Sequence, residues 1–270
     1  MSYQTLTLDL RGGVAHVRFS RPEKANALSR TGWDELRQVF DEISHRDEAR
    51  VAILSGEGKH FSSGIDLALL MEAGQISGNG CEGRKREQLR AFILHLQGCI
   101  DAIAQCRKPV LAAVHGGCIG GAVDIVAACD MRYCTEDAYF CIKEIDMGMV
   151  ADLGTLQRLP KLIPDGMARE MAYTGRKVFG PEALRVGLVN RTYPDAAALM
   201  EGVGEIAALI ASKSPLSVRG TKEMLNYTRD HSVADSLNYM AAWNAGMLIS
   251  EDLAAAFQAS LTKREAVFRD

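Results

Sequence analysis

The stretch that decides the fold is HGGCIGGAVD, residues 115–124. It follows an apolar run at 109–114, which we expect to be a buried strand, and it opens an apolar helix at 122–128. Glycines at such a strand-to-helix turn let the backbone approach a ligand closely, and the first amides of the helix point outward. The spacing fits neither the G-x-G-x-x-G dinucleotide pattern nor a phosphate-binding loop that ends in G-K-[ST].

A second segment of the same kind is FSSGIDL, residues 61–67. It follows an expected strand at 50–54 and precedes an expected helix that starts near Asp66. Each turn can offer one backbone N–H to a developing oxyanion, and one such donor is worth about 3–4 kcal/mol of transition-state stabilisation. Either turn alone would be interpreted as structural, but the pair predicts an oxyanion hole.

Three acidic residues occur where burial is expected. Asp124 lies in an apolar helix turn, Glu144 has Asp146 beside it, and Asp152 interrupts the otherwise apolar stretch 147–154. A single acid of this kind would be interpreted as a cap or an ion pair, but three near the two turns favour a functional site. Apolar surroundings raise the pKa of a carboxyl group, which suits acid–base chemistry near neutral pH.

The rest of the pattern predicts an α/β fold. Alternating runs around a Gly-Gly turn predict a hairpin of strands at 5–10 and 14–19. Strands and helices then alternate, with further helices from Ser29 and over 85–106, an exposed mobile loop at 74–83, and short strands at 131–134 and 138–142. After residue 195 we expect helices only, over 196–213, 215–228 and 231–261. The predicted division is a core of residues 1–195 and a helical C-terminal region of residues 196–270.

Composition excludes several classes of protein. The 270 residues carry 31 basic and 34 acidic side chains, so the net charge of −3 suggests no nucleic-acid partner. The seven cysteines lack a C-x-x-C pair, which is typical of reduced thiols inside a cell. The six histidines lack metal-binding spacing, so we expect no metal site. We see no signal peptide and no membrane insertion, and we expect a bacterial cytoplasmic protein.

The two turns resemble the crotonase (enoyl-CoA hydratase/isomerase) superfamily. Residues 143–161, KEIDMGMVADLGTLQRLPK, are similar to the Δ(3,5)-Δ(2,4)-dienoyl-CoA isomerase family, and residues 212–215 and 229–239 extend that similarity. The resemblance implies a spiral of ββα units with a helical C-terminal trimerisation region, assembled as a homotrimer or a homohexamer. It also implies an acyl-CoA substrate and no cofactor, since CoA is part of that substrate.

The resemblance further implies the roles of individual residues. The backbone amides of Ile65 and Gly121 would hold the thioester oxygen. In a 1,5-proton shift from 3,5-dienoyl-CoA to 2,4-dienoyl-CoA, a step of unsaturated fatty acid β-oxidation, Asp152 would remove a proton from C2 and Glu144 would deliver one at C6. Asp124 would support the site. The implied substrate and CoA contacts are Lys24, Ala27, Ser63, Gly64, Ile65, Asp66, Leu67, Gly120 and Gly121.

Two alternatives remain open at this point. One is a 2-enoyl-CoA hydratase or 3-enoyl-CoA isomerase, which would use the same oxyanion hole. The other is a non-catalytic relative that binds RNA, although the acidic balance of the chain and the three retained acids disfavour it.

Overall fold

A six-stranded sheet forms the centre of the computed structural model, which describes residues 3–75 and 81–270. The strand order is β1-β2-β3-β4-β6-β9. The hairpin β1–β2 is antiparallel and the other strands pair in parallel. The bounds are β1 (Leu6–Arg11), β2 (Val14–Phe19), β3 (Val51–Gly56), β4 (Val110–Val114), β6 (Met131–Thr135) and β9 (Arg191–Tyr193).

A smaller sheet includes part of the glycine-rich stretch 115–124. It contains β5 (Gly117–Ile119), β7 (Tyr139–Cys141) and β8 (Val178–Phe179) in the order β5-β7-β8. Because β4 belongs to the large sheet and β5 to the small one, the chain changes sheets inside residues 115–124. The structure confirms the predicted α/β class, while β5, β8 and β9 were not anticipated as strands.

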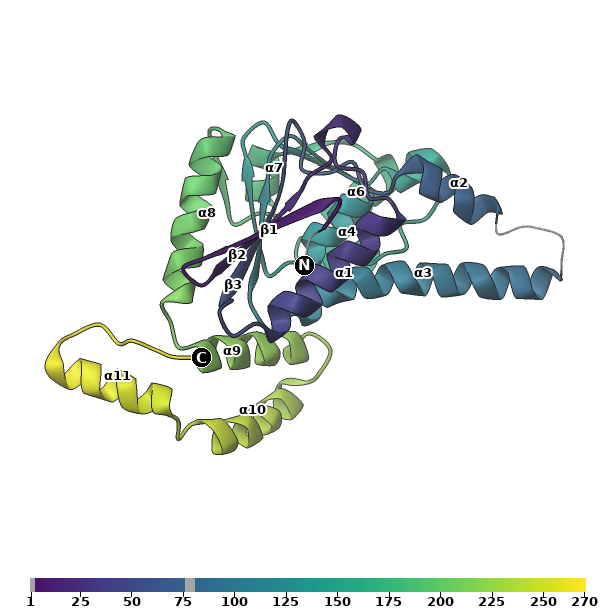
Figure 1. Ribbon diagram of the computed structural model, residues 1–270. Helices are drawn as coiled ribbons and strands as arrows, with labels where there is room; N and C mark the ends of the chain where they lie inside the picture. The colour runs from purple at the N-terminus through teal and green to yellow at the C-terminus, as the bar shows by residue number, and fades with distance from the viewer. Residues whose placement is uncertain (1–2, 76–80) are drawn as a thin grey trace.

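Helices cover both faces of the large sheet (Figure 1). On one face lie α1 (Arg30–His45), α3 (Glu82–Gln105) and α4 (Gly121–Ala128), and on the other lies α8 (Ala196–Ala211). Side chains of β3 alternate between the two cores, with Ala52 and Leu54 on the first and Val51 and Ile53 on the second. Two covered faces explain why β3 is apolar throughout.

Short elements complete the body of the molecule. They are η1 (Pro22–Lys24), α2 (Leu67–Gln75), η2 (Glu144–Met147), α5 (Thr155–Arg158), η3 (Leu159–Lys161), α6 (Asp165–Thr174) and α7 (Gly180–Arg185). The predicted loop at 74–83 is only partly a loop, because α2 runs to Gln75 and α3 begins at Glu82. Its residues 76–80 lie outside the described residues.

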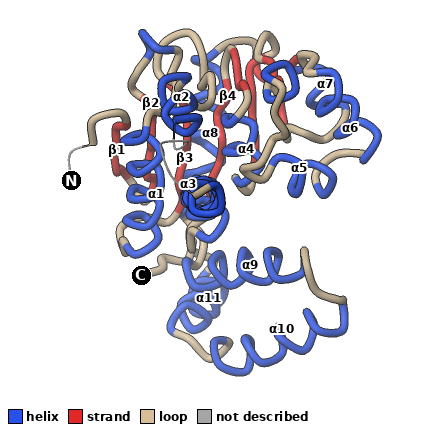
Figure 2. Tube along the Cα trace, turned by 90° about the vertical axis from the view of Figure 1, so that its right-hand side faces the viewer, coloured by secondary structure: helices blue, strands red, loops and turns tan. Residues whose placement is uncertain are grey.

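The last three helices form a separate layer beside the body (Figure 2). They are α9 (Pro215–Thr228), α10 (Val233–Met247) and α11 (Glu251–Thr262). The predicted single helix over 231–261 is wrong. The chain leaves the helix after Met247, and Ser250 starts a new one by accepting a hydrogen bond from the Leu253 amide at 3.2 Å. Among the helices of the described ranges, none is both long enough and apolar enough to cross a bilayer.

Candidate active site

The two glycine-rich turns pack backbone against backbone. The Ser62 amide donates to the Gly117 carbonyl at 3.2 Å, and the Ile119 amide donates to the Ser62 carbonyl at 3.1 Å. Gly64 has a φ of +82°, and a methyl group there would lie 2.5 Å from the Ile119 oxygen and 2.8 Å from the Gly121 nitrogen. Glycine at position 64 is therefore needed both for the backbone conformation and for this close approach.

This packing brings the two predicted oxyanion donors together. A methyl group on Gly121 would lie 3.6 Å from the Ile65 nitrogen, and Gly121 is the first residue of α4. Neither the Ile65 amide nor the Gly121 amide donates a hydrogen bond to any other described residue. Two free N–H groups side by side, one at a helix N-terminus, can receive the oxygen of a carbonyl compound.

The segment that carries Lys24 and Ala27 is bound to the first turn. The Ser63 amide donates to the Ala25 carbonyl at 2.9 Å, and the Leu28 amide donates to the Gly64 carbonyl at 2.8 Å. Lys24 lies exposed in η1, and Ala27 is half-buried next to the turn. The structure therefore places both residues beside residues 63–65.

Asn26 organises this junction and was not anticipated. It is buried with a φ of +54°, a conformation that asparagine tolerates better than most residues. Its side-chain amide donates to the backbone carbonyls of Glu57 and His60, both at 2.8 Å. Its own backbone carbonyl accepts a hydrogen bond from the Ser62 hydroxyl at 2.8 Å. The sequence did contain a signal for this role, because residues 22–26 (P-E-K-A-N) combine a proline with a following asparagine, as tight turns do.

Asp66 directly precedes α2, and Leu67 is the first residue of that helix. The Asp66 carboxylate accepts from the Ala68 amide at 3.1 Å and forms an ion pair with Arg21 at 3.4 Å, while its own amide donates to the Leu28 carbonyl. Leu67 is exposed. Asp66 thus fixes the start of the helix, and Leu67 is free to contact a bound molecule.

Asp124 lies on α4 with no solvent exposure. Its Oδ1 accepts a hydrogen bond from the Thr155 amide at 2.6 Å, whereas its buried Oδ2 has no partner among the described residues. Burial raises the pKa of this carboxyl to about 7, and the charges of Glu144 and Asp152 add to the increase. The three acids are therefore close enough to influence one another electrostatically.

Glu144 lies at the start of η2, against the second turn. A methyl group on Gly120, whose φ is +55°, would lie 3.2 Å from Glu144 Oε1. The buried Oε2 has no hydrogen-bond partner among the described residues. Burial raises the pKa of Glu144, and the charge of Asp152 raises it further. The carboxyl group thus lies beside the turn that ends at the Gly121 amide.

Asp152 belongs to the segment between η2 and α5 and is more exposed than the other two acids. Partial burial still raises the pKa of its carboxyl. Its backbone carbonyl accepts a hydrogen bond from the Gln97 side chain on α3 at 2.6 Å. The combined arrangement of three acids with raised pKa values near two free amides suits proton transfer on a carbonyl compound.

A cavity of about 570 Å³ lies next to the Asp152 segment. Its lining includes Gln97, Leu153 and Gly154, but none of the three acids and neither oxyanion donor. The size of this cavity therefore does not identify it as the reaction site.

Known proteins resemble this chain over most of its length. Residues 9–270 match the family model described as enoyl-CoA hydratase/isomerase. The chain is 48% identical over 254 residues to the mitochondrial Δ(3,5)-Δ(2,4)-dienoyl-CoA isomerase of Mus musculus, covering 93% of this chain and 77% of that protein. It is 47% identical over 271 residues to the peroxisomal Δ(3,5)-Δ(2,4)-dienoyl-CoA isomerase of Arabidopsis thaliana, covering 99% and 98%. The crystal structure of an enoyl-CoA hydratase from Bacillus anthracis superimposes with a TM-score of 0.87 at 29% identity, covering 98% of this chain and 99% of that one.

The same relatives correct the expected location. The sequence led us to expect a cytoplasmic protein, but the mouse relative is named mitochondrial and the plant relative peroxisomal. The cytoplasmic prediction is therefore wrong. It rested on targeting segments not seen in the sequence, and such an absence does not define a compartment.

Proposed function

Because this chain belongs to the enoyl-CoA hydratase/isomerase family, we propose that it converts 3,5-dienoyl-CoA thioesters into 2,4-dienoyl-CoA thioesters. The observation that carries the proposal is the third acid. Asp152 lies near Asp124 and Glu144 and raises the pKa of both. Two spatially separated carboxyls are what a proton shift between distant carbons requires, and the relatives named dienoyl-CoA isomerases support this substrate class.

In this proposal the thioester oxygen accepts hydrogen bonds from the amides of Ile65 and Gly121. Loss of a C2 proton converts the thioester into an enolate, and its negative charge develops on that oxygen. Donors that are already in place stabilise this charge without reorganising, which lowers the barrier to proton abstraction. The CoA and acyl portions contact the remaining residues of the two turns and the segment tied to them, namely Lys24, Ala27, Ser63, Gly64, Asp66, Leu67 and Gly120.

The proton shift assigns different roles to Asp152 and Glu144. Asp152, the more exposed acid, is ionised and takes the proton from C2. The electron pair spreads over the conjugated dienolate to C6, where Glu144 delivers a proton. Burial raises the pKa of Glu144, which favours the protonated form that this role needs. One proton leaves C2 and one reaches C6, so the double bonds move without a redox cofactor.

Asp124 supports the site in this proposal without exchanging a proton with carbon. Its Oδ1 is held by the Thr155 amide, and its free Oδ2 offers one polar atom inside an apolar helix turn. A pKa near 7 lets the group become neutral when its neighbours are ionised, which limits like-charge repulsion among the three acids.

We also propose that the chain works as a homotrimer or a dimer of trimers, with residues 196–270 as the assembly region. Helices α10 and α11 contain no buried residue in the single chain. Their exposed apolar side chains include Leu237 (65%), Phe257 (64%) and Leu261 (80%). An apolar surface of this kind on two helices is expected to be covered by another protein surface.

The test follows formation of the conjugated 2,4-dienoyl product by absorbance. Wild type is expected to convert 3,5-dienoyl-CoA rapidly, and Asp152→Asn should lower kcat by about 10²–10⁴-fold, the usual contribution of a positioned acid or base. Asp146→Asn is the matched control, because Asp146 is an exposed acid in η2 paired with Lys143 at 2.6 Å. Its kcat should remain at the wild-type value.

Two results would contradict the proposal. Unchanged turnover in Asp152→Asn would remove the assigned base. Wild-type protein that leaves 3,5-dienoyl-CoA unchanged but hydrates a 2-enoyl-CoA would be a hydratase built on the same oxyanion hole.

A further inference from the structure

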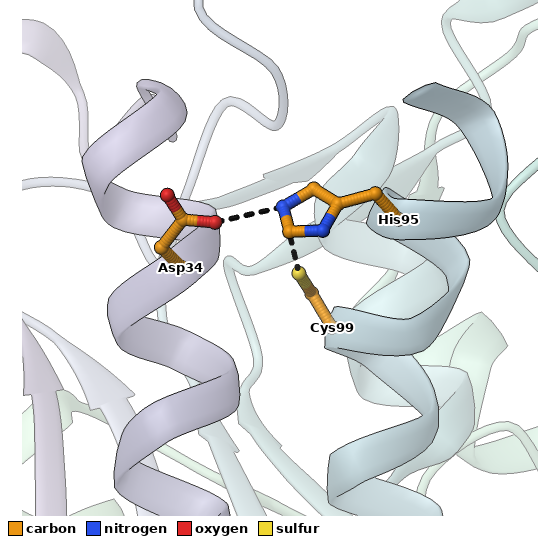
Figure 3. A group of neighbouring side chains, drawn as sticks. All are labelled: Asp34, His95 and Cys99. Atoms are coloured by element: carbon orange, nitrogen blue, oxygen red, sulfur yellow. Dashed lines mark hydrogen bonds and ion pairs between the residues drawn. The ribbon is translucent and has the colours of Figure 1, made fainter. Parts of the chain in front are cut away.

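Three potential metal ligands, none of them assigned to the proposed reaction site, meet between α1 and α3. Asp34 projects from α1, and His95 and Cys99 project from α3 toward it (Figure 3). His95 Nε2 lies 2.7 Å from Asp34 Oδ1 and 4.0 Å from Cys99 Sγ. The three ligand atoms all lie within 4.8 Å of one another.

We propose that Asp34, His95 and Cys99 bind a divalent transition-metal ion of the zinc type. Zinc binds nitrogen at about 2.0 Å, carboxylate oxygen at about 2.0–2.2 Å and sulfur at about 2.3 Å, which places tetrahedral ligand atoms about 3.3–3.6 Å apart. The separations of 2.7 Å and 4.0 Å lie on either side of that range. Side-chain adjustments of about an ångström therefore suffice.

The direction of the imidazole favours a cation over a thiol nucleophile. A Cys-His-Asp catalytic arrangement places the thiol and the carboxylate on opposite ring nitrogens. Here both groups face the same nitrogen, Nε2, so they converge on one point.

Access also suits an ion. The side chains of His95 and Asp34 are 41% and 40% exposed, while Cys99 is buried. An ion can therefore enter from solvent and keep a water molecule as its fourth ligand, an arrangement with three protein ligands and one open position.

The consequence of binding would be a cross-link between α1 and α3. This cross-link matters for the proposed reaction site, because Gln97 lies on α3 only two residues after His95. The Gln97 side chain donates a hydrogen bond to the Asp152 carbonyl at 2.6 Å. A bound ion would fix α3 against α1 and so stabilise the element that positions this segment. A ligand that binds only the folded chain also raises its melting temperature.

The experiment measures ion binding directly. Full-length protein is stripped with a chelator and titrated with Zn²⁺ by calorimetry and with Co²⁺ by absorbance, which reports a cobalt–thiolate bond as a charge-transfer band. Wild type should bind one ion per chain, show the thiolate band with Co²⁺, and melt at a higher temperature with Zn²⁺. Cys99→Ser should lose the band, and Asp34→Asn should weaken binding at least about 10–100-fold, since even outer-shell changes cost that much.

The control variants each replace a cysteine or a histidine that lies outside the cluster of Asp34, His95 and Cys99. Cys81→Ser removes the exposed thiol at the start of α3, and His45→Gln removes an exposed imidazole at the end of α1. Both variants should bind like wild type. Absence of binding to wild type would overturn the proposal, as would equal affinity in Asp34→Asn, or a charge-transfer band that disappears in Cys81→Ser and persists in Cys99→Ser.

Discussion

Asp124 is a carboxylate enclosed by the apolar residues of α4, and its ionisation opposes folding. The pKa of this carboxyl is about 7 in the folded chain, against 3.8 for an unperturbed aspartate such as that of the unfolded chain. Between these two pH values the folded chain therefore binds one proton that the unfolded chain has released. Stability that is complete below pH 4 is therefore lost as the pH rises toward 7. Each pH unit in this window costs about 1.4 kcal/mol.

Asp124→Asn tests this effect, because asparagine keeps the oxygen that accepts from Thr155 and removes the charge. The free energy of unfolding of the variant, relative to wild type, should increase by about 1.4 kcal/mol per pH unit between pH 4 and pH 7 and level off above. Urea denaturation at four pH values measures it. A difference that does not change with pH would show that Asp124 is not the titrating group.

Gly64 offers a second residue-scale prediction. In Gly64→Ala the methyl group would meet the Ile119 oxygen at 2.5 Å and the Gly121 nitrogen at 2.8 Å, so the two turns must separate. Loss of one oxyanion donor lowers kcat by about 10²–10³-fold. Gly12→Ala is the matched control, since Gly12 also has a positive φ (+57°) but nothing within 4 Å. It should lose some stability, through the backbone conformation alone, and keep its kcat.

At the scale of elements, α3 links the core to the proposed base. Gln97 lies on this helix and donates to the Asp152 carbonyl, so we expect it to position the Asp152 segment. Gln97→Met keeps the length of the side chain and removes the donor. It should lower kcat by about tenfold, corresponding to one lost hydrogen bond of about 1.4 kcal/mol, with KM unchanged.

Gln105→Met is the control for this prediction, because Gln105 is an exposed residue of the same helix. Steady-state kinetics of both variants, with melting temperatures, separate positioning from loss of folding. Equal kcat values for Gln97→Met and wild type would contradict the positioning role, and a rise in KM alone would indicate substrate contact.

The last two helices show where the apolar periodicity of the sequence was not sufficient to predict the bounds of an element. Apolar residues over 231–261 have helical spacing, which predicted one helix, but the chain breaks between Met247 and Glu251. A serine cap depends on the local backbone conformation, which the apolar period does not report. By contrast, the hairpin and α9 were predicted closely, because a Gly-Gly turn and a proline at the first helical position are local signals.

At the scale of the whole molecule, α10 and α11 form an apolar layer outside the body (Figure 2). If this layer is the assembly surface, Ile249→Glu combined with Phe257→Glu should shift the protein from trimer or hexamer toward monomer. The two side chains are 88% and 64% exposed in the single chain, and buried charges oppose association. Sedimentation velocity measures the change.

Leu184→Glu is the control for assembly, since Leu184 is an exposed apolar residue of α7 in the body of the molecule. It should leave the sedimentation coefficient unchanged. Wild type that sediments as a monomer would contradict the proposed assembly, and so would a double variant that remains a trimer or hexamer.

The sequence by itself determined the α/β class, the two glycine-rich turns and the three acids of the candidate site. Each of these rests on neighbouring residues: a backbone conformation that glycine allows, or a carboxyl group among apolar side chains. Tertiary structure alone decided that Asn26 holds the first turn in place, that Gln97 meets Asp152, and that Asp34 meets His95. The last two pairs are 55 and 61 residues apart in the chain. No local pattern records such a contact, because it exists only once helices and sheets have packed.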